Sequence, residues 1–307
     1  FSPDALAASL AEGDILVSML PGDFHVPLAT MCVERRAHFV SSSYIAPEMR
    51  ALDAAAREAG VALVNEVGLD PGIDHLMAHR LVAQYRAGPA YDPDNVLSFT
   101  SYCGGVPKIP NDFRYKFSWS PLGVLKALRA PSRSIKNFEP FEVTRPWDAI
   151  TEYLAPLTEP EIFEAYPNRD SLPFIADYQF NTDWRVKEFV RGTLRLAGWQ
   201  DAWRSVFEDI DSLSGATGDA RLQAMADAFW QAHAYAEDEP DRVVLCVSLK
   251  AERENRPVWH RTYALDAWGD ERGSAMARLV SNMVALAVGA VGRGQIGSGV
   301  SAAPSAP

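Results

Sequence analysis

Cysteine is scarce in this sequence, and no two cysteines lie close together. The chain has three among its 307 residues, Cys32, Cys103 and Cys246, and none belongs to a CxxC pair. This excludes a disulfide framework and a zinc ribbon, because both need clustered cysteines. We interpret the three as small buried side chains in a reducing compartment, and we expect a cytoplasmic protein.

The sequence also lacks an excess of basic residues and a long apolar run. Its formal net charge is −11 and its isoelectric point is near 5.1, whereas a nucleic-acid-binding protein needs a basic face. No uninterrupted run of about 18 apolar residues suggests a membrane span, and no signal peptide is visible. We therefore expect a small-molecule partner, with no nucleic acid and no membrane.

Motifs that carry hydrolysis or dinucleotide binding are missing or out of place. There is no GxSxG segment, which argues against an α/β-hydrolase. The GxGxxG match at Gly292–Gly297 follows a helical pattern and precedes a Ser/Ala/Pro tail, whereas a pyrophosphate site needs a strand before it and a helix after it. We predict that these glycines end a helix.

A metal site is not expected either. His75 and His79 are four residues apart, a spacing that can hold a metal ion on one helix. Position 76 is Leu where an HExxH motif has Glu, and no third ligand is placed nearby. We interpret both as solvated or core histidines.

Residues 1–80 alternate between strand and helix patterns. The alternation predicts a parallel sheet with right-handed crossovers, the second half of a Rossmann-type nucleotide-binding domain. The first βαβ unit, with its phosphate-binding glycines, is missing from the sequence, and we expect both ends to be cut. The expected strands are 14–20, 38–42 and 61–65, and the expected helices are 27–36 and 47–59, the second ended by Gly60.

Residues 81–300 read as a mixed-sheet α+β domain with a helical part at about 199–236. Residues 130–185, rich in proline and aromatic side chains, are expected to hold few regular elements, and 301–307 is expected to be a flexible tail. The expected strands are 96–102, 115–119 and 189–196, with an antiparallel hairpin of 242–250 and 258–265; the expected helices are 121–129, 199–213, 220–235 and 275–291.

The segment Asn65–His75 lies where a strand ends and a helix begins. Open α/β sheets bind ligands at this edge, outside the carboxyl ends of their strands. Asp70 can cap the helix with Pro71 in its first turn, and Gly68 and Gly72 let a ligand approach the backbone. Asp70 is therefore either a helix cap or a catalytic group.

A second candidate is the strand that carries Arg191, Thr193 and Arg195. Alternation along a strand places these three side chains on one face. Two guanidinium groups beside a hydroxyl can bind carboxylates, although a solvated strand face has the same pattern. Arg169 lies in a turn-rich loop, where it is either a ligand clamp or the partner of Asp170 in a surface ion pair.

Taken together, these segments resemble the saccharopine reductase family, the NADP-dependent, L-glutamate-forming saccharopine dehydrogenases. The resemblance implies a Rossmann-type domain, a mixed-sheet substrate domain that also forms a homodimer, and a small helical part. The matching stretches occur in order along nearly the whole chain: Ser43–Tyr44, Asn65–His75, Ser101–Gly105, Tyr115–Ser120, Tyr166–Ser171, Arg191–Arg195, Asp266–Asp270 and Gly273–Ala277.

The resemblance also implies the roles of individual residues. Asp70 is expected to be catalytic, as the polar group nearest the substrate amine. The residues expected along the NADP cofactor are Leu20, Pro21, Leu69, Asp70, Pro71, Trp119, Ser120 and Pro121. Those expected to contact the substrate are Ser43, Tyr44, Asp70, Arg169, Thr193, Leu194 and Arg195.

The expected activity is hydride transfer between NADP(H) and the C–N bond of saccharopine, in lysine metabolism. Two alternatives stay open: a related imine reductase such as carboxynorspermidine dehydrogenase, and a non-catalytic binding or scaffold protein that lacks the cofactor turn. The segment that reads the adenosine ribose is absent, and Lys108–Arg114 is less acidic than the corresponding loop of fungal relatives. Because the glycine turn is absent, we expect the isolated chain to bind NADPH weakly.

Overall fold

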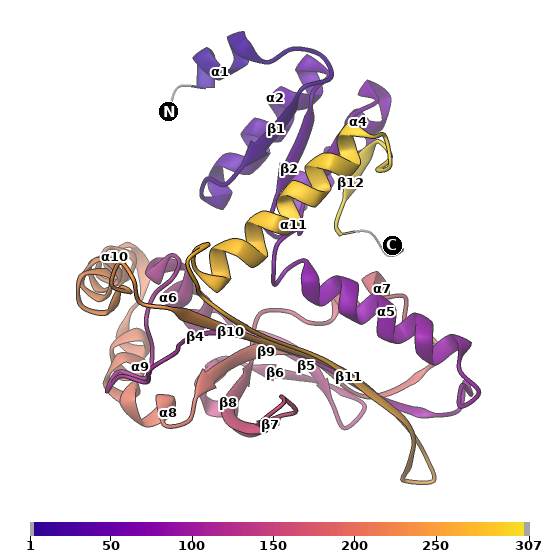
Figure 1. Ribbon diagram of the computed structural model, residues 1–307, viewed down its shortest axis with the longest axis vertical. Coiled ribbons are helices and arrows are strands. Elements are labelled where there is room, and N and C mark those ends of the chain that lie inside the picture. Colours follow the sequence, from indigo (N-terminus) through magenta and orange to yellow (C-terminus); the bar gives the residue numbers. More distant parts are fainter. Residues whose placement is uncertain (1–2, 304–307) are drawn as a thin grey trace. The chain divides into compact units, whose positions relative to one another are not determined.

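The computed structural model describes residues 3–303 and divides into two compact units (Figure 1). The first unit comprises Phe1–Leu76 and Ala277–Pro307, and the second comprises Met77–Met276. The chain enters the second unit within helix α5 (Ile73–Ala87) and returns to the first within helix α11 (Ala275–Gly292).

The first unit is built on a four-stranded, fully parallel sheet. Its order β1-β2-β3-β12 shows that the C-terminal segment adds the last strand. The predicted parallel, Rossmann-type sheet is confirmed. The strands are β1 (Ile15–Ser18), β2 (His38–Ser41), β3 (Ala62–Val64) and β12 (Gly299–Ser301), and the short helices are α1 (Pro3–Ser9), η1 (Gly22–Phe24), α2 (His25–Arg35), α3 (Pro47–Arg50) and α4 (Asp53–Ala59).

Helices cover both faces of this sheet, because its strands are apolar on both faces. Phe39 and Leu63 pack with α2 and α4 on one face, whereas Val40 and Val64 pack with α11 on the other. The helix predicted over 47–59 is two helices, α3 and α4, separated by a turn. Gly60 ends α4 in a left-handed conformation, φ 74°, as predicted.

The prediction of a flexible tail over residues 301–307 is wrong for residues 301–303. Ser301 pairs with Val64 in β12, and Ala303 is buried; residues 304–307 lie outside the described part of the chain. A three-residue strand has no periodicity of its own, so only its pairing with β3 makes it a strand. The prediction that the 292–297 glycines end a helix is confirmed, because α11 stops at Gly292.

Helix α11 is long and apolar enough, by length and composition, to cross a membrane. The uninterrupted-run criterion did not detect it, because Arg278, Ser281 and Asn282 interrupt its apolar residues. Val284 and Val291 belong to a core cluster of the first unit, although only 22% of the helix is buried. The absence of a membrane partner therefore stays a prediction.

The second unit contains an eight-stranded mixed sheet, as predicted. Its main order is β11-β10-β4-β9-β5-β6, with β8 also paired to β9 and β7 paired to β8. Strands β4 and β9 are parallel, and the predicted hairpin is the antiparallel pair β10–β11. The strands are β4 (Val96–Pro107), β5 (Ser132–Lys136), β6 (Glu139–Val143), β7 (Thr151–Ala155), β8 (Glu161–Pro167), β9 (Arg185–Leu196), β10 (Asp241–Arg253) and β11 (Arg256–Trp268).

Helices at one end of this sheet form an aromatic core around Trp199 and Trp203. The strand predicted over 115–119 is wrong: Tyr115 and Phe117 are alternately buried because they pack into this core, and the only described ladder contact is a bridge from Phe117 to Ala234. These helices are α6 (Pro121–Arg129), η2 (Pro146–Ala149), α8 (Trp199–Ala202), α9 (Arg204–Ser212) and α10 (Gly215–His233). The second unit also contains α7 (Pro173–Asp177), which lies outside this core.

Residues 130–185 hold more regular structure than expected, namely β5 to β8 and α7. Strands β6 and β7 are exposed at most positions and carry charged side chains, so they lack the apolar alternation that identifies a half-buried strand. Their partners in the sheet decide their conformation. The predicted start of α11 at Ala275 is confirmed. The sequence did not indicate that the distant Asp241 carboxylate accepts the N–H groups of Ala275 and Met276, at 2.6 and 2.9 Å.

Candidate active site

In the first unit, two loops meet at the carboxyl edge of the parallel sheet. One follows β2 and the other follows β3, and parallel neighbouring strands end at the same edge. The Glu66 N–H donates to the Ser43 carbonyl at 3.1 Å, and the Val67 N–H donates to the Ser41 carbonyl at 3.5 Å. These backbone bonds hold the loop after β2 beside the loop after β3.

Two of the predicted site residues meet in these loops. The Tyr44 hydroxyl donates a hydrogen bond to Oδ1 of Asp70 at 3.0 Å, and both side chains are half-buried. A carboxylate accepts several hydrogen bonds, so Asp70 can accept from Tyr44 and from a ligand at once. Ser43 lies next to Tyr44 on the same loop.

Asp70 is not a helix cap, and Pro71 is not in the first helical turn. Helix α5 begins at Ile73. Its first amides donate to the turn before it, Ile73 N–H to the Gly68 carbonyl at 3.0 Å and Asp74 N–H to the Leu69 carbonyl at 3.2 Å. Asp70 therefore lies in the turn before α5, where its Oδ1 accepts the Tyr44 hydroxyl.

Gly68 and Gly72 serve the turn itself. Gly72 has φ 147°, and a Cβ there would collide with the backbone of Gly68. The Gly68 N–H donates back to the Pro71 carbonyl at 2.9 Å, which closes the turn. The two glycines therefore allow the close backbone approach that positions Asp70.

We expect Gly72→Ala to lower the free energy of unfolding by about 2 kcal/mol or more, because the new Cβ needs the turn to open. Gly22→Ala is the matched control: Gly22 has nothing within 4 Å of an added Cβ, and its replacement should change stability by less than about 0.5 kcal/mol. Urea unfolding measures both. Equal effects would contradict the argument.

Residues at the carboxyl end of β1 fit the apolar part of a dinucleotide. Met19, Leu20 and Phe24 are large apolar side chains exposed at this edge, beside exposed Pro21. Such an exposed apolar surface can pack against an aromatic ring. Leu69 and Pro71, also predicted along the cofactor, are buried, so their side chains belong to the core of the unit.

In the second unit, Arg195 is a buried cation in an aromatic box. Its side chain is on β9, the residue is 5% exposed, and its guanidinium lies 4.6, 5.3 and 5.6 Å from the ring centroids of Tyr115, Trp199 and Tyr166. Nη1 donates to the Leu194 carbonyl at 3.1 Å. Among residues 3–303, no acceptor lies within hydrogen-bonding distance of its Nε.

This arrangement leaves the charge of Arg195 without an anion inside the unit. Within the described chain, no carboxylate forms an ion pair with Arg195. Burial raises the pKa of the Tyr166 hydroxyl, so this phenol stays neutral at pH 7. A buried charge is costly unless it is paired, and an anionic ligand would supply the missing partner.

The predicted alternation along β9 is confirmed, and the solvated-face alternative is wrong. Arg191, Thr193 and Arg195 are all buried, and the Arg191 guanidinium lies 3.9 Å from the ring centroid of Phe174. Leu194 is fully buried in the core cluster on the opposite face of the strand. Its side chain is therefore excluded from the ligand contacts expected for it.

The remaining predicted residues lie elsewhere in the second unit. Arg169 is exposed in the loop after β8, which runs beside β9 because the Asn168 N–H donates to the Arg191 carbonyl at 3.0 Å. Asp170 forms an ion pair with Arg133 at 3.3 Å. A backbone hydrogen bond therefore holds this loop beside β9, the strand of the buried arginines.

Trp119, Ser120 and Pro121 form the start of α6. Ser120 is its N-cap, and its hydroxyl accepts the Gly123 N–H at 3.1 Å, as predicted. Trp119 is exposed and lies against Gly123, where an added Cβ would come within 2.6 Å of its ring. Trp119 therefore presents an aromatic face beside a helix start, while the Ser120 hydroxyl is occupied by capping.

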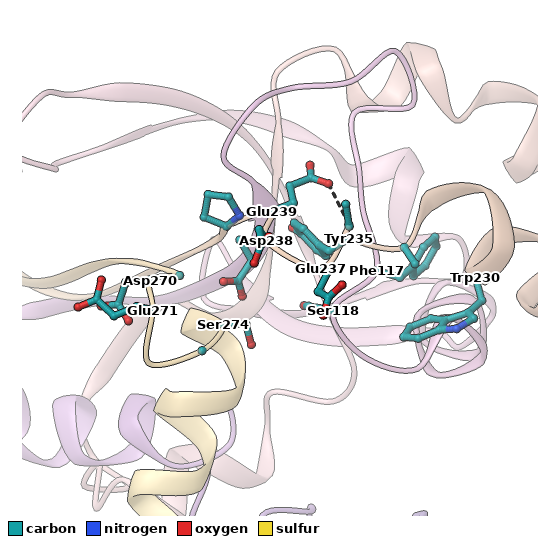
Figure 2. A pocket seen from close by; sticks show the side chains of 16 residues that line it. Phe117, Ser118, Trp230, Tyr235, Glu237, Asp238, Glu239, Asp270, Glu271 and Ser274 are labelled. Carbon is teal, nitrogen blue, oxygen red and sulfur yellow. Dashed lines mark hydrogen bonds between the residues drawn. The ribbon is translucent and has the colours of Figure 1, made fainter.

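The sequence analysis did not detect an acidic pocket of about 650 Å³ in the second unit (Figure 2). Six carboxylates line it, and a Lys116 ion pair neutralises one of them, Glu239. A negative lining disfavours a substrate rich in carboxylates, so this pocket does not suit the same ligand as Arg195. Its carboxylates are Glu237, Asp238, Glu239, Asp241, Asp270 and Glu271.

Two family models match the chain. A family model described as the saccharopine dehydrogenase NADP binding domain matches residues 2–64, and one described as the saccharopine dehydrogenase C-terminal domain matches residues 68–306. The first match ends at the carboxyl end of β3. The second begins in the turn that carries Asp70.

Curated relatives match about two thirds of the chain. It is 38% identical over 213 residues to saccharopine dehydrogenase (NADP+, L-glutamate-forming) of Pyricularia oryzae, covering 68% of this chain and 46% of that protein. It is 36% identical over 208 residues to the mitochondrial alpha-aminoadipic semialdehyde synthase of Mus musculus, covering 65% of this chain and 21% of that protein. The chain therefore spans less than half the length of these relatives.

Solved structures share the fold. Apo saccharopine dehydrogenase (L-Glu forming) from Saccharomyces cerevisiae matches with a TM-score of 0.79 and 26% identity, over 98% of this chain and 82% of that one. Homospermidine synthase from Legionella pneumophila, at 12% identity, matches with a TM-score of 0.58 over 98% of this chain and 74% of that one, a likeness of fold alone.

Proposed function

The chain belongs to the saccharopine dehydrogenase family, as its motifs suggested, and on this premise we propose that it acts in an NADP-linked oxidoreductase of lysine metabolism. The proposed reaction is hydride transfer at the C–N bond of saccharopine. The observation that carries this proposal is Arg195, a buried guanidinium with an unsatisfied Nε and aromatic walls. Saccharopine has three carboxylates, and one of them would complete this site.

Some of the predicted residues would contact the cofactor, and others would contact the substrate. Leu20 and Pro21 would lie along NADP in the first unit, and Trp119 would contribute an aromatic face in the second. The NADP binding domain match over residues 2–64 supports this choice of cofactor. When bound, NADP+ supplies the hydride acceptor.

The chain's own groups would bind the substrate and handle its protons. Loss of hydride converts the secondary amine of saccharopine to an imine, water adds to it, and the C–N bond breaks to give glutamate and aminoadipate semialdehyde. Asp70 would accept the amine N–H or stabilise the cationic imine, because its carboxylate is anchored by Tyr44 and accepts further hydrogen bonds. Arg195, with Arg169 at the neighbouring loop, would fix the carboxylates.

The proposal is tested on the full-length gene product with saccharopine and NADP+, by following NADPH absorbance. The reverse direction compares aminoadipate semialdehyde plus glutamate with imines made from polyamines. We expect turnover of aminoadipate semialdehyde plus glutamate with NADPH. Its kcat/KM should be at least about tenfold higher than the kcat/KM for the polyamine imines. Preference for the polyamine imines would favour a carboxynorspermidine-type reductase, and no turnover with either would favour a binding or scaffold role.

We further infer a cytoplasmic homodimer. The three cysteines are free thiols, which suits a reducing compartment. Within the described residues, β11 pairs on one side alone, and an open edge strand of this length can pair with a second copy. Light scattering coupled to gel filtration should give twice the mass of the chain, and a monomeric mass would contradict the homodimer.

A further inference from the structure

Glu66 links the two loops that carry Tyr44 and Asp70. It is 4% exposed and is the second residue after β3. Its Oε1 accepts the Ile45 N–H at 2.8 Å, next to Tyr44, and its Oε2 lies 2.8 Å from Nε2 of His75. One carboxylate therefore contacts the loop after β2 and the start of helix α5.

His75 continues the link to the turn of Asp70. It is 2% exposed, and its Nδ1 lies 3.5 Å from Oδ2 of Asp74. Oδ1 of Asp74 in turn accepts the Gly72 N–H at 2.7 Å. The chain of contacts thus runs from Ile45 to Gly72, that is, from the residue after Tyr44 to the second residue after Asp70.

This network is more than ordinary core packing. Glu66 has φ 57°, a left-handed conformation that few non-glycine residues adopt, and such strain is typical of functional sites. Buried charged groups rarely stabilise a fold better than apolar ones of equal size. A buried polar network does, however, fix the relative position of the segments it joins.

We propose that Glu66 and His75 are positioning residues that hold the Tyr44 hydroxyl against the Asp70 carboxylate. The inference rests on the proposed function, because Tyr44 and Asp70 then face the substrate amine. Glu66 acts through the backbone beside Tyr44, and His75 acts through Asp74 on the backbone beside Asp70. Neither side chain touches the substrate.

A double-mutant cycle in the full-length gene product tests the proposal. We expect Glu66→Ala to lower kcat for saccharopine by about 30-fold, since misplacing a reacting group by about 1 Å costs on the order of 100-fold. The KM for saccharopine should change less than about threefold. Glu66→Gln should retain most of the turnover, because its amide oxygen still accepts from Ile45 and its N–H can donate to His75.

In a Tyr44→Phe background, Glu66→Ala should lower kcat by less than about threefold further, since the contact it positions is already gone. His75→Ala should show the same non-additivity. It replaces Glu66→Ala in the double-mutant cycle if Glu66→Ala does not fold. An equal loss in both backgrounds would mean that these residues only support the fold, and it would overturn the inference.

Hydrogen exchange separates this inference from the proposed function, because it needs no substrate. Glu66→Ala should speed exchange at the amides of Ile45 and Gly72 by at least about tenfold, and Glu66→Gln should do so far less. Asp53→Ala is the control: it removes the acceptor of the Val300 N–H and should leave both loops unchanged. Unchanged exchange in Glu66→Ala would overturn the inference, even in an enzyme that turns over saccharopine.

Discussion

Asp70→Asn should lower kcat for saccharopine oxidation by about 100-fold, with little change in the KM for saccharopine. A positioned proton acceptor contributes on the order of 100-fold or more to a reaction rate, and the amide cannot take up a proton or balance the charge of an imine. The amide oxygen can still accept the Tyr44 hydroxyl, which Oδ1 accepts at 3.0 Å. Steady-state kinetics on the full-length gene product measures both constants.

The matched control for this prediction is Asp53→Asn. Asp53 is an aspartate of the same unit, in helix α4, where it pairs with Arg57 at 2.8 Å. The Asp53→Asn variant should keep its kcat within about twofold of the unmodified enzyme, because Asp53 lies outside the two loops that carry Tyr44 and Asp70. Near-normal turnover in Asp70→Asn would remove the catalytic role of Asp70 and leave the turn as a structural feature.

Arg195→Met should raise the KM for saccharopine by about 100-fold, with no change in the dissociation constant of NADPH. Truncating one partner of a buried, hydrogen-bonded charge pair costs about 2–5 kcal/mol of binding, and about 2.8 kcal/mol corresponds to 100-fold. Methionine fills similar space between the rings of Tyr115 and Trp199 without a charge. Initial rates against saccharopine concentration and NADPH titration by fluorescence measure the two constants.

The stability of this variant gives an independent criterion. Because the Arg195 charge has no carboxylate partner in the described chain, the ligand-free protein should lose no stability when the charge is removed. Arg242→Met is the control: Arg242 pairs with Asp266 and Glu161, each at 2.7 Å. It should lower the free energy of unfolding by about 2 kcal/mol, since both carboxylates are partly exposed.

The pair of variants separates a ligand-binding arginine from a structural one. Loss of substrate affinity with unchanged stability in Arg195→Met assigns the charge to the substrate. If instead Arg195→Met destabilises the protein as much as Arg242→Met and leaves the KM unchanged, its guanidinium serves the aromatic box alone. The proposed function would then lose its main physical support.

The sequence predicted those features that depend on local periodicity. Alternation along Arg191, Thr193 and Arg195 correctly placed the three side chains on one strand face. The strand–helix alternation over 1–80 correctly predicted a parallel sheet, and Ser120 before Pro121 correctly marked the start of α6. Each of these needs the properties of neighbouring residues alone.

Other predictions were wrong because distant partners decide the outcome. Tyr115–Trp119 alternates like a strand, yet it packs into a helical core. Ser301 reads as part of a tail, yet it pairs with Val64 of β3. The sequence left open whether Asp70 caps a helix, and in the structure the carbonyls of Gly68 and Leu69 accept the first amides of α5.

The sequence by itself determined the class of the fold, the family and the residue types able to bind carboxylates, because periodicity and motif order are properties of the chain. Tertiary structure alone decided which charges are buried and what they contact. Arg195 is buried without a carboxylate, whereas Arg242 is buried with two. The physical reason is that desolvation and pairing depend on three-dimensional neighbours, and Glu66 meets its partners Ile45 and His75 only after the loops have folded.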